Sequence, residues 1–109
     1  MKQILRIYIQ RTIDDDADTS ALDWRRIIDY NHSRFNFISI KAVAEVLFTE
    51  PGPQQTIVSG GVKNVEDDWN PDLISEYEEA QYLELIGQLR AMGFQNGEID
   101  KFVPEELRA

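Results

Sequence analysis

Apolar and polar positions alternate along three stretches of the chain, which is the spacing of β-strands that bury one face. The clearest stretch is 34–48, and residues 2–11 and 54–59 form the other two. The segment 49–53 holds Pro-Gly-Pro, which favours a tight turn, so 35–59 is predicted to form a hairpin. The inner face of the central strand would consist of Ile38, Ile40, Ala42, Ala44 and Val46.

A first helix is predicted between the first two strands, over residues 21–31, with Thr19 or Ser20 as its N-cap. Its apolar side chains recur at helical spacing, and we expect Arg25 and Arg26 to face outward. An aspartate-rich run at 14–18 precedes it. Like charges repel one another within a regular element, so this run is expected to form an exposed loop.

The longest helix is predicted to begin at Asn70-Pro71, with Asn70 as the N-cap and Pro71 in the first turn. Gly93 is expected to end it. Asn96-Gly97 is then predicted to begin a short terminal helix around 98–102, which stops at Pro104. The apolar stripe of the long helix consists of Ile74, Tyr77, Leu85, Leu89 and Met92, widened by Tyr82 and Ile86.

The element order is therefore β-α-β-β-α-α, which predicts an α+β fold. We expect a small three-stranded antiparallel sheet with the helices packed on one face. The small Ala42 and Ala44 side chains would let a helix lie across the central strand. A chain of 109 residues with no linker-like segment is expected to form a single domain, 1–109.

The net charge of the chain is −9, and its distribution is uneven. Residues 64–109 carry three basic and twelve acidic side chains, so this part alone accounts for a balance of −9. Direct binding to nucleic acid or to an anionic membrane is disfavoured, because both require basic patches. A basic protein partner is favoured by the same reasoning, although solubility alone explains such acidity about as well. With no cysteine, no leader and no long apolar run, a cytoplasmic location is expected.

Catalytic motifs find little support in this sequence. Ser59, before Gly60-Gly61, has only His32 as a possible histidine base, and the residues around Ser59 lack the nucleophile-elbow pattern. The glycine pair also lacks the P-loop spacing and leads into carboxylates that would repel phosphate. Neither aspartate-rich run has the ligand spacing of a calcium loop. We therefore expect no enzyme activity, no cofactor and no specific metal site.

An acidic surface is the candidate functional feature, starting where the charge changes after Gly61. Four carboxylates fall away from the apolar stripe of the long helix and could occupy a basic groove: Asp72, Glu76, Glu79 and Glu84. The alternative is an ordinary solvated helix face. Glu78 lies within the stripe, so either the core ends before that turn or Glu78 has a specific partner. The candidate binding residues are Glu66, Asp67, Asp68, Trp69, Asp72, Glu76 and Glu79.

Several segments occur in an order that resembles a family of small acidic proteins of bacteriophages and mobile elements. They are "RIYIQRT", the Asp run ending in "DTS", "FISIKAVAEV", "TIVSGG" with its acid run, and "LIGQLRAMGF". The family has no established activity, so the resemblance carries over no site residues. It implies an accessory protein that blocks host machinery such as CRISPR or restriction complexes.

The leading hypothesis is thus a non-catalytic acidic protein that binds a basic, nucleic-acid-handling host protein or nucleoprotein complex. The alternative is a self-associating structural or regulatory module, most simply a homodimer. A three-stranded sheet leaves strand edges open, and Trp24, Trp69 and Tyr82 could add apolar contact area.

Overall fold

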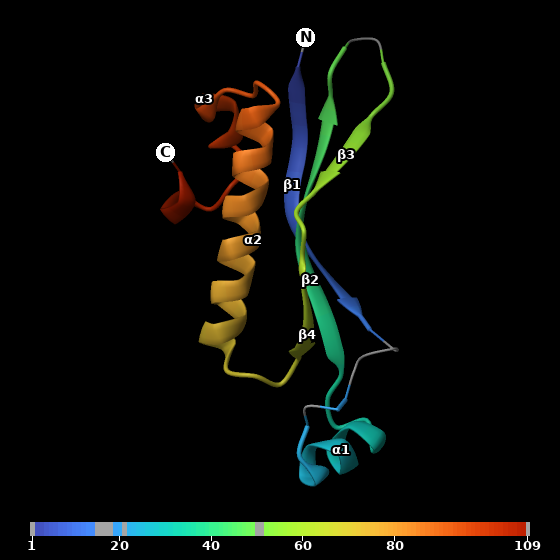
Figure 1. The fold of residues 1–109 in the computed structure, drawn as a ribbon. Coiled ribbons are helices and arrows are strands. Elements are labelled where there is room, and N and C mark those ends of the chain that lie inside the picture. Colours follow the sequence, from blue (N-terminus) through green and yellow to red (C-terminus); the bar gives the residue numbers. More distant parts are fainter. Residues whose placement is uncertain (1, 15–18, 21, 50–51, 109) are drawn as a thin grey trace.

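The computed structural model describes residues 2–14, 19–20, 22–49 and 52–108. It is an α+β fold in which a long helix covers one face of an antiparallel sheet (Figure 1). The strands are β1 (Gln3–Ile13), β2 (Phe37–Leu47), β3 (Gln55–Val58) and β4 (Val62–Glu66). The helices are α1 (Trp24–Asn31), α2 (Pro71–Ala91) and α3 (Asn96–Ile99), followed by a 3-10 turn, η1 (Glu105–Leu107).

Strand β2 is the centre of the sheet. It pairs antiparallel with β1 on one side and with both β3 and β4 on the other. Strands β3 and β4 follow one another along the same edge of β2, so the sheet is three strands wide at any point (Figure 1). The predicted hairpin is confirmed, since Val43 pairs with Val58 and Val46 with Gln55.

The core lies between β2 and α2. The predicted inner face of β2 is confirmed, and Ala42 and Ala44 are fully buried beneath the helix. On α2 the buried side chains include Ile74, Leu85 and Leu89 as predicted, whereas Met92 is 37% exposed. The C-terminal segment closes one end of this core with Phe94, Ile99 and Val103.

The ends of α2 follow the local signals in the sequence. The Asn70 side chain accepts a hydrogen bond from the Asp72 amide at 2.9 Å, and Pro71 is the first helical residue. At the other end Gly93 has φ of +95°, a left-handed conformation that glycine adopts without steric cost. Both predicted boundaries of the long helix are confirmed.

The first helix differs from the prediction. It begins at Trp24, with Asp23 as N-cap, and not at residue 21 with Thr19 or Ser20 as cap. It lies beyond the end of the sheet and contains no buried residue (Figure 1). The prediction that helices pack on one face therefore holds for α2 and α3 but not for α1. Of the aspartate run, residues 15–18 lie outside the described part of the chain.

Two further elements were not predicted. The first is β4, residues 62–66, since no strand was predicted after residue 59. The second is η1, which follows Pro104; the terminal helix before it begins at Asn96 as predicted but ends at Ile99 and not at 102. Strand β4 was missed because Gly60-Gly61 interrupts the alternation and acidic residues follow it. Its pairing with β2, for example Val62 with Ile40, becomes visible only in three dimensions.

Candidate functional site

Three predicted binding residues lie on the solvent side of α2. Asp72, Glu76 and Glu79 are spaced by four and three residues, which places them on one side of a helix, and all three are exposed. Within the described chain none of the three forms an ion pair. We call these three residues the acidic face of α2.

Two other glutamates of α2 are used within the fold. Glu78 forms an ion pair with Arg11 of β1. Of the two explanations that the sequence left open for Glu78, a specific partner is the one found. Glu84 accepts a hydrogen bond from the Gly60 amide at 2.6 Å and so supports the junction between β3 and β4.

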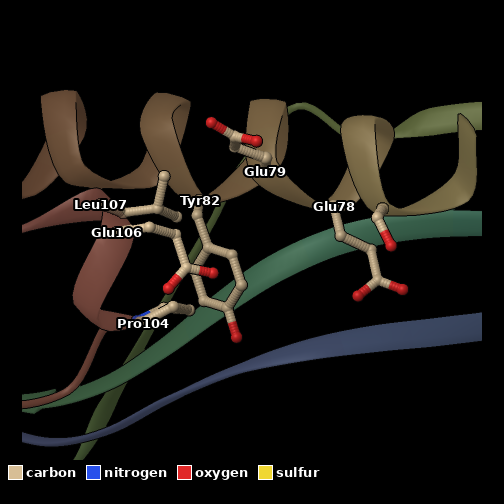
Figure 2. A pocket seen from close by; sticks show the side chains of 7 residues that line it. Glu78, Glu79, Tyr82, Pro104, Glu106 and Leu107 are labelled. Atoms are coloured by element: carbon tan, nitrogen blue, oxygen red, sulfur yellow. The ribbon is translucent and has the colours of Figure 1, made fainter. Parts of the chain in front are cut away.

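An acidic hollow of about 280 Å³ opens beside this face, between α2 and η1. Figure 2 shows the Tyr82 ring at its centre, with Glu106 and Leu107 on one side and Glu78 on the other. Burial raises the pKa of the Tyr82 hydroxyl, and the nearby Glu78 charge adds to the increase. The complete lining consists of Ser75, Glu78, Glu79, Tyr82, Pro104, Glu106 and Leu107.

This hollow suits one kind of ligand group. Carboxylates at its rim can accept hydrogen bonds from an ammonium or guanidinium, while Tyr82 and Leu107 offer apolar surface to an aliphatic stem. The Tyr82 ring can also attract a cation placed over its face. Glu106 and Leu107 were not predicted from the sequence, because the chain was expected to contribute no element after Pro104.

The predicted residues before α2 have a different setting. Glu66 is buried, and one of its carboxylate oxygens accepts hydrogen bonds from Arg26 Nε at 2.8 Å and Nη2 at 2.5 Å. Asp68 accepts from the same guanidinium at 2.8 and 3.1 Å. The guanidinium also lies 3.8 Å from the centre of the Phe35 ring. We call this group of four residues the Arg26 clasp.

The Arg26 clasp corrects one prediction. Arg26 does not face outward but joins α1 to the end of β4. Arg25 forms no ion pair within the described residues, and its guanidinium carbon lies 5.3 Å from the centre of the Trp24 ring. The hydrogen bonds that the Arg26 guanidinium donates to Asp68 and Glu66 are the main causes of its strongly raised pKa. Glu66 and Asp68 are therefore already engaged inside the protein.

Asp67 and Trp69 also contribute to local structure. The Asp67 carboxylate accepts from the Asn36 amide at 3.0 Å, and the Asp67 amide donates to the Asn36 carbonyl at 2.9 Å. Trp69 donates its indole N–H to Glu66 and packs against the cluster that contains Ile74. Trp69 therefore packs against the cluster that includes the first buried side chain of α2.

The Ser59-Gly60-Gly61 segment is a junction between two strands. The Ser59 hydroxyl accepts from the Ala42 amide at 2.9 Å and lies 2.6 Å from Gln81 Oε1, to which it donates. Gly61 also donates to Gln81 Oε1, at 2.9 Å. Ser59 is 4% exposed. Neither Ser59 nor His32 lines the acidic hollow or a second hollow on α1. These contacts give the segment a structural role.

A second hollow, of about 340 Å³, lies on α1. It is lined by Trp24, Arg25, Ile28, Asp29 and Arg34, and Trp24 is 66% exposed. Of the three aromatic residues considered for self-association, Trp24 is thus the exposed one, while Trp69 and Tyr82 are half-buried.

Among the described residues, no group of three or more His, Cys, Asp or Glu side chains is arranged to hold a metal ion. In that same part of the chain, no helix combines the length and apolar character needed to cross a membrane.

The comparisons with known proteins give no relative. No family model, no curated protein and no solved structure matches the chain.

Proposed function

We propose that this protein is a non-catalytic binding protein that places the acidic face of α2 and the adjoining hollow against a basic partner protein. The observation that supports it most is the uncompensated charge of Asp72, Glu76 and Glu79. The arginines Arg6, Arg11, Arg26 and Arg34 each pair with a carboxylate elsewhere in the fold. The negative charge of this face is therefore available to a partner.

The spacing of these carboxylates also supports the proposal. Side chains three and four residues apart on a helix lie about 5–6 Å apart at their Cβ atoms, comparable to successive phosphates of a nucleic-acid strand. A groove that binds a nucleic-acid backbone would then accept this helix in its place. The hollow would bind one arginine or lysine side chain of that groove. This contact would fix the position of α2 along the groove.

The kind of partner follows from the resemblance to small acidic phage and mobile-element proteins. We propose a basic host protein that handles nucleic acid in the bacterial cytoplasm, blocked in the manner of an anti-CRISPR or anti-restriction inhibitor. This step is an argument from a class of proteins. Direct binding of the chain itself to nucleic acid is not part of the proposal.

The test is a comparison of two variants with the same change in net charge. Glu76→Gln with Glu79→Gln removes two negative charges from the acidic face, and Gln54→Lys with Thr56→Lys adds two positive charges on and beside β3. Proteins captured by the wild-type chain from nuclease-treated bacterial extract should be basic, released by salt and displaced by added nucleic acid. The first variant should lose them and the second should keep them.

Two results would refute the proposal. One is capture that is indifferent to salt and to nucleic acid. The other is equal loss in both variants, because that would show an effect of overall charge and not of this face. Glu66 and Asp68 are unsuitable for such a test, since a change there would disrupt the Arg26 clasp and the fold around it.

A further inference from the structure

Among the strands that the structure describes, β1 has the longest open edge. Strand β1 has eleven residues and pairs with β2 alone, and no other described strand lies along its outer side (Figure 1). An open edge presents backbone N–H and C=O groups to solvent and is a template for a further strand.

The hydrogen-bond pattern identifies these groups. The Asp14 amide donates to the Phe37 carbonyl at 2.8 Å, and the register of β1 with β2 continues from this pair. In an antiparallel ladder alternate residues bond to the same neighbour, so Thr12, Gln10 and Tyr8 direct their backbone groups to β2. The opposite set points to the open side and consists of Ile7, Ile9, Arg11 and Ile13.

The N-terminal end of this edge is covered. The Ile4 amide donates to Glu98 of α3 at 3.4 Å, and the register shifts between Ile4 and Arg6. A bulge of this kind limits further pairing. The span open to a new strand is therefore 7–13.

The side chains along this span are incompletely covered by the fold. Ile7 and Ile9 are half-buried, and Ile13 is 59% exposed although it lies on the same side of the sheet as the core. Helix α2 packs mainly on β2, which leaves the β1 side of this face thinly covered. The edge thus combines free backbone groups with apolar side chains.

Charge does not prevent two such edges from meeting. Inward-pointing charges commonly protect a strand edge, and Arg11 is such a residue. Here Arg11 pairs with Glu78, and Arg6 pairs with Glu45 at 2.7 Å. Both arginines of β1 are neutralised within their own copy, so repulsion between two β1 strands is small.

We propose that residues 7–13 of β1 pair antiparallel with the same residues of a second copy, giving a symmetric dimer with one continuous sheet. With a two-fold axis at Gln10, all four residues whose backbone groups point to the open side find a partner. Ile7 then lies opposite Ile13 of the second copy, and Ile9 lies opposite Arg11. Each of these pairs exchanges two backbone hydrogen bonds. The exposed Ile13 gains an apolar neighbour in the same register.

The arrangement leaves room for both long helices. The two β2 strands would be three strand spacings apart, or about 14 Å. Helices packed against each other need only 8–10 Å between their axes, so the two α2 helices fit on the same face without overlap. This dimer does not rest on the proposed function, because it uses the strand edge and not the acidic face; the two surfaces adjoin at Glu78, which lines the hollow and pairs with Arg11 of the edge.

The test compares Ile13→Lys with Ile28→Lys. Both replace an exposed isoleucine with lysine and change the net charge equally, but Ile28 lies on α1, away from β1. Sedimentation velocity should show a wild-type dimer and an unchanged Ile28→Lys dimer, with the dissociation constant of Ile13→Lys raised at least tenfold. The proposal would be overturned if the wild-type chain stays monomeric up to about 1 mM. At that concentration a dimer with an association free energy of only about −4 kcal/mol would be detected.

Amide hydrogen exchange by NMR separates this dimer from any other. The amides of Ile7, Ile9 and Arg11 should exchange rapidly in dilute protein and become protected as the concentration rises. Those of Tyr8 and Gln10, bonded to β2, should be protected throughout. A dimer in which the odd-numbered amides stay unprotected, or one lost in Ile28→Lys but kept in Ile13→Lys, also overturns it.

Discussion

Replacing Arg26 with methionine should release α1 from the rest of the protein. Helix α1 has eight residues and buries none of them, and isolated helices of that length are unstable in water. Its attachment depends on the Arg26 clasp and on Tyr30, whose ring lies 5.7 Å from Phe35 and 5.2 Å from Phe37. Methionine keeps most of the aliphatic volume but removes the cation.

The magnitude follows from what the substitution leaves behind. The Glu66 side chain is 11% exposed, so without Arg26 a nearly buried carboxylate loses its counter-charge. Breaking a fully buried pair costs about 3–5 kcal/mol. Water reaches this pair, because the side chain of Arg26 is 30% exposed, and Trp69 still donates to Glu66. We therefore expect a loss of about 2–3 kcal/mol in the free energy of unfolding.

The assay is urea denaturation of Arg26→Met, Glu66→Gln and the double variant, with Arg34→Met as control. Arg34 is an arginine paired with Asp29, but its side chain is 64% exposed, so its loss should cost less than about 1 kcal/mol. The double variant should be less destabilised than the sum of the single variants by about 1.5 kcal/mol or more. Hydrogen exchange should accelerate across 24–31 while α2 stays protected.

Two results would refute this reasoning. If Arg26→Met destabilises the protein no more than Arg34→Met, the clasp behaves as an ordinary surface ion pair. If the two single effects add without coupling, Arg26 and Glu66 do not depend on each other. In either case α1 would need another explanation for its position.

Three further predictions concern the sheet junction, two glycines and one tyrosine. Ser59→Ala should lower the unfolding free energy by about 2 kcal/mol in urea denaturation, because it leaves the buried Ala42 amide without an acceptor. Gly61→Ala should lower the free energy of unfolding by about 1–2 kcal/mol, because φ at this residue is +82°. Gly87→Ala lies on an open helix surface and should raise it by about 0.5–1 kcal/mol. Thermal melts should therefore show shifts of opposite sign for the two variants. The pKa of Tyr82 is raised in the folded state, so its protonated hydroxyl contributes to the free energy of unfolding below pH about 10, and this contribution is lost as the pH rises through the folded-state pKa. Tyr82→Phe should therefore reduce the loss of stability at alkaline pH. An unchanged dependence of stability on pH would contradict this.

Features set by neighbouring residues were predictable from the sequence. The start of α2 depends on Asn70 and Pro71, its end on Gly93, and the inner face of β2 on strict alternation. Each of these signals acts within a few residues, and tertiary packing did not override any of them. The α+β class followed from the order of such elements.

Features that join distant segments were not predictable in the same way. Arg26 and Glu66 are 40 residues apart, and helical phase placed Arg26 on an outer face because α1 was assumed to lie on the sheet. The acidic hollow requires η1 to lie beside Tyr82, which no local pattern indicates. The run 66–68 looked like a surface in sequence, but two of its carboxylates hold Arg26 and the third bonds to Asn36.

The two proposed surfaces would act together in a dimer. Pairing of β1 strands places both α2 helices on one face of the sheet, so two copies of the acidic face would point the same way. A dimer could then bind two basic sites at once, and its avidity would exceed the affinity of one site by about 100-fold or more.

This coupling can be measured on surfaces coated with an arginine-rich peptide. On a dense surface the wild type and Ile28→Lys should dissociate slowly and Ile13→Lys rapidly. The reason is that only the first two form dimers, which can bind two peptides at once. On a sparse surface all three should dissociate alike, since each dimer then finds a single peptide. A difference that persists at low density would show that Ile13 affects the binding site itself and not the joining of two copies.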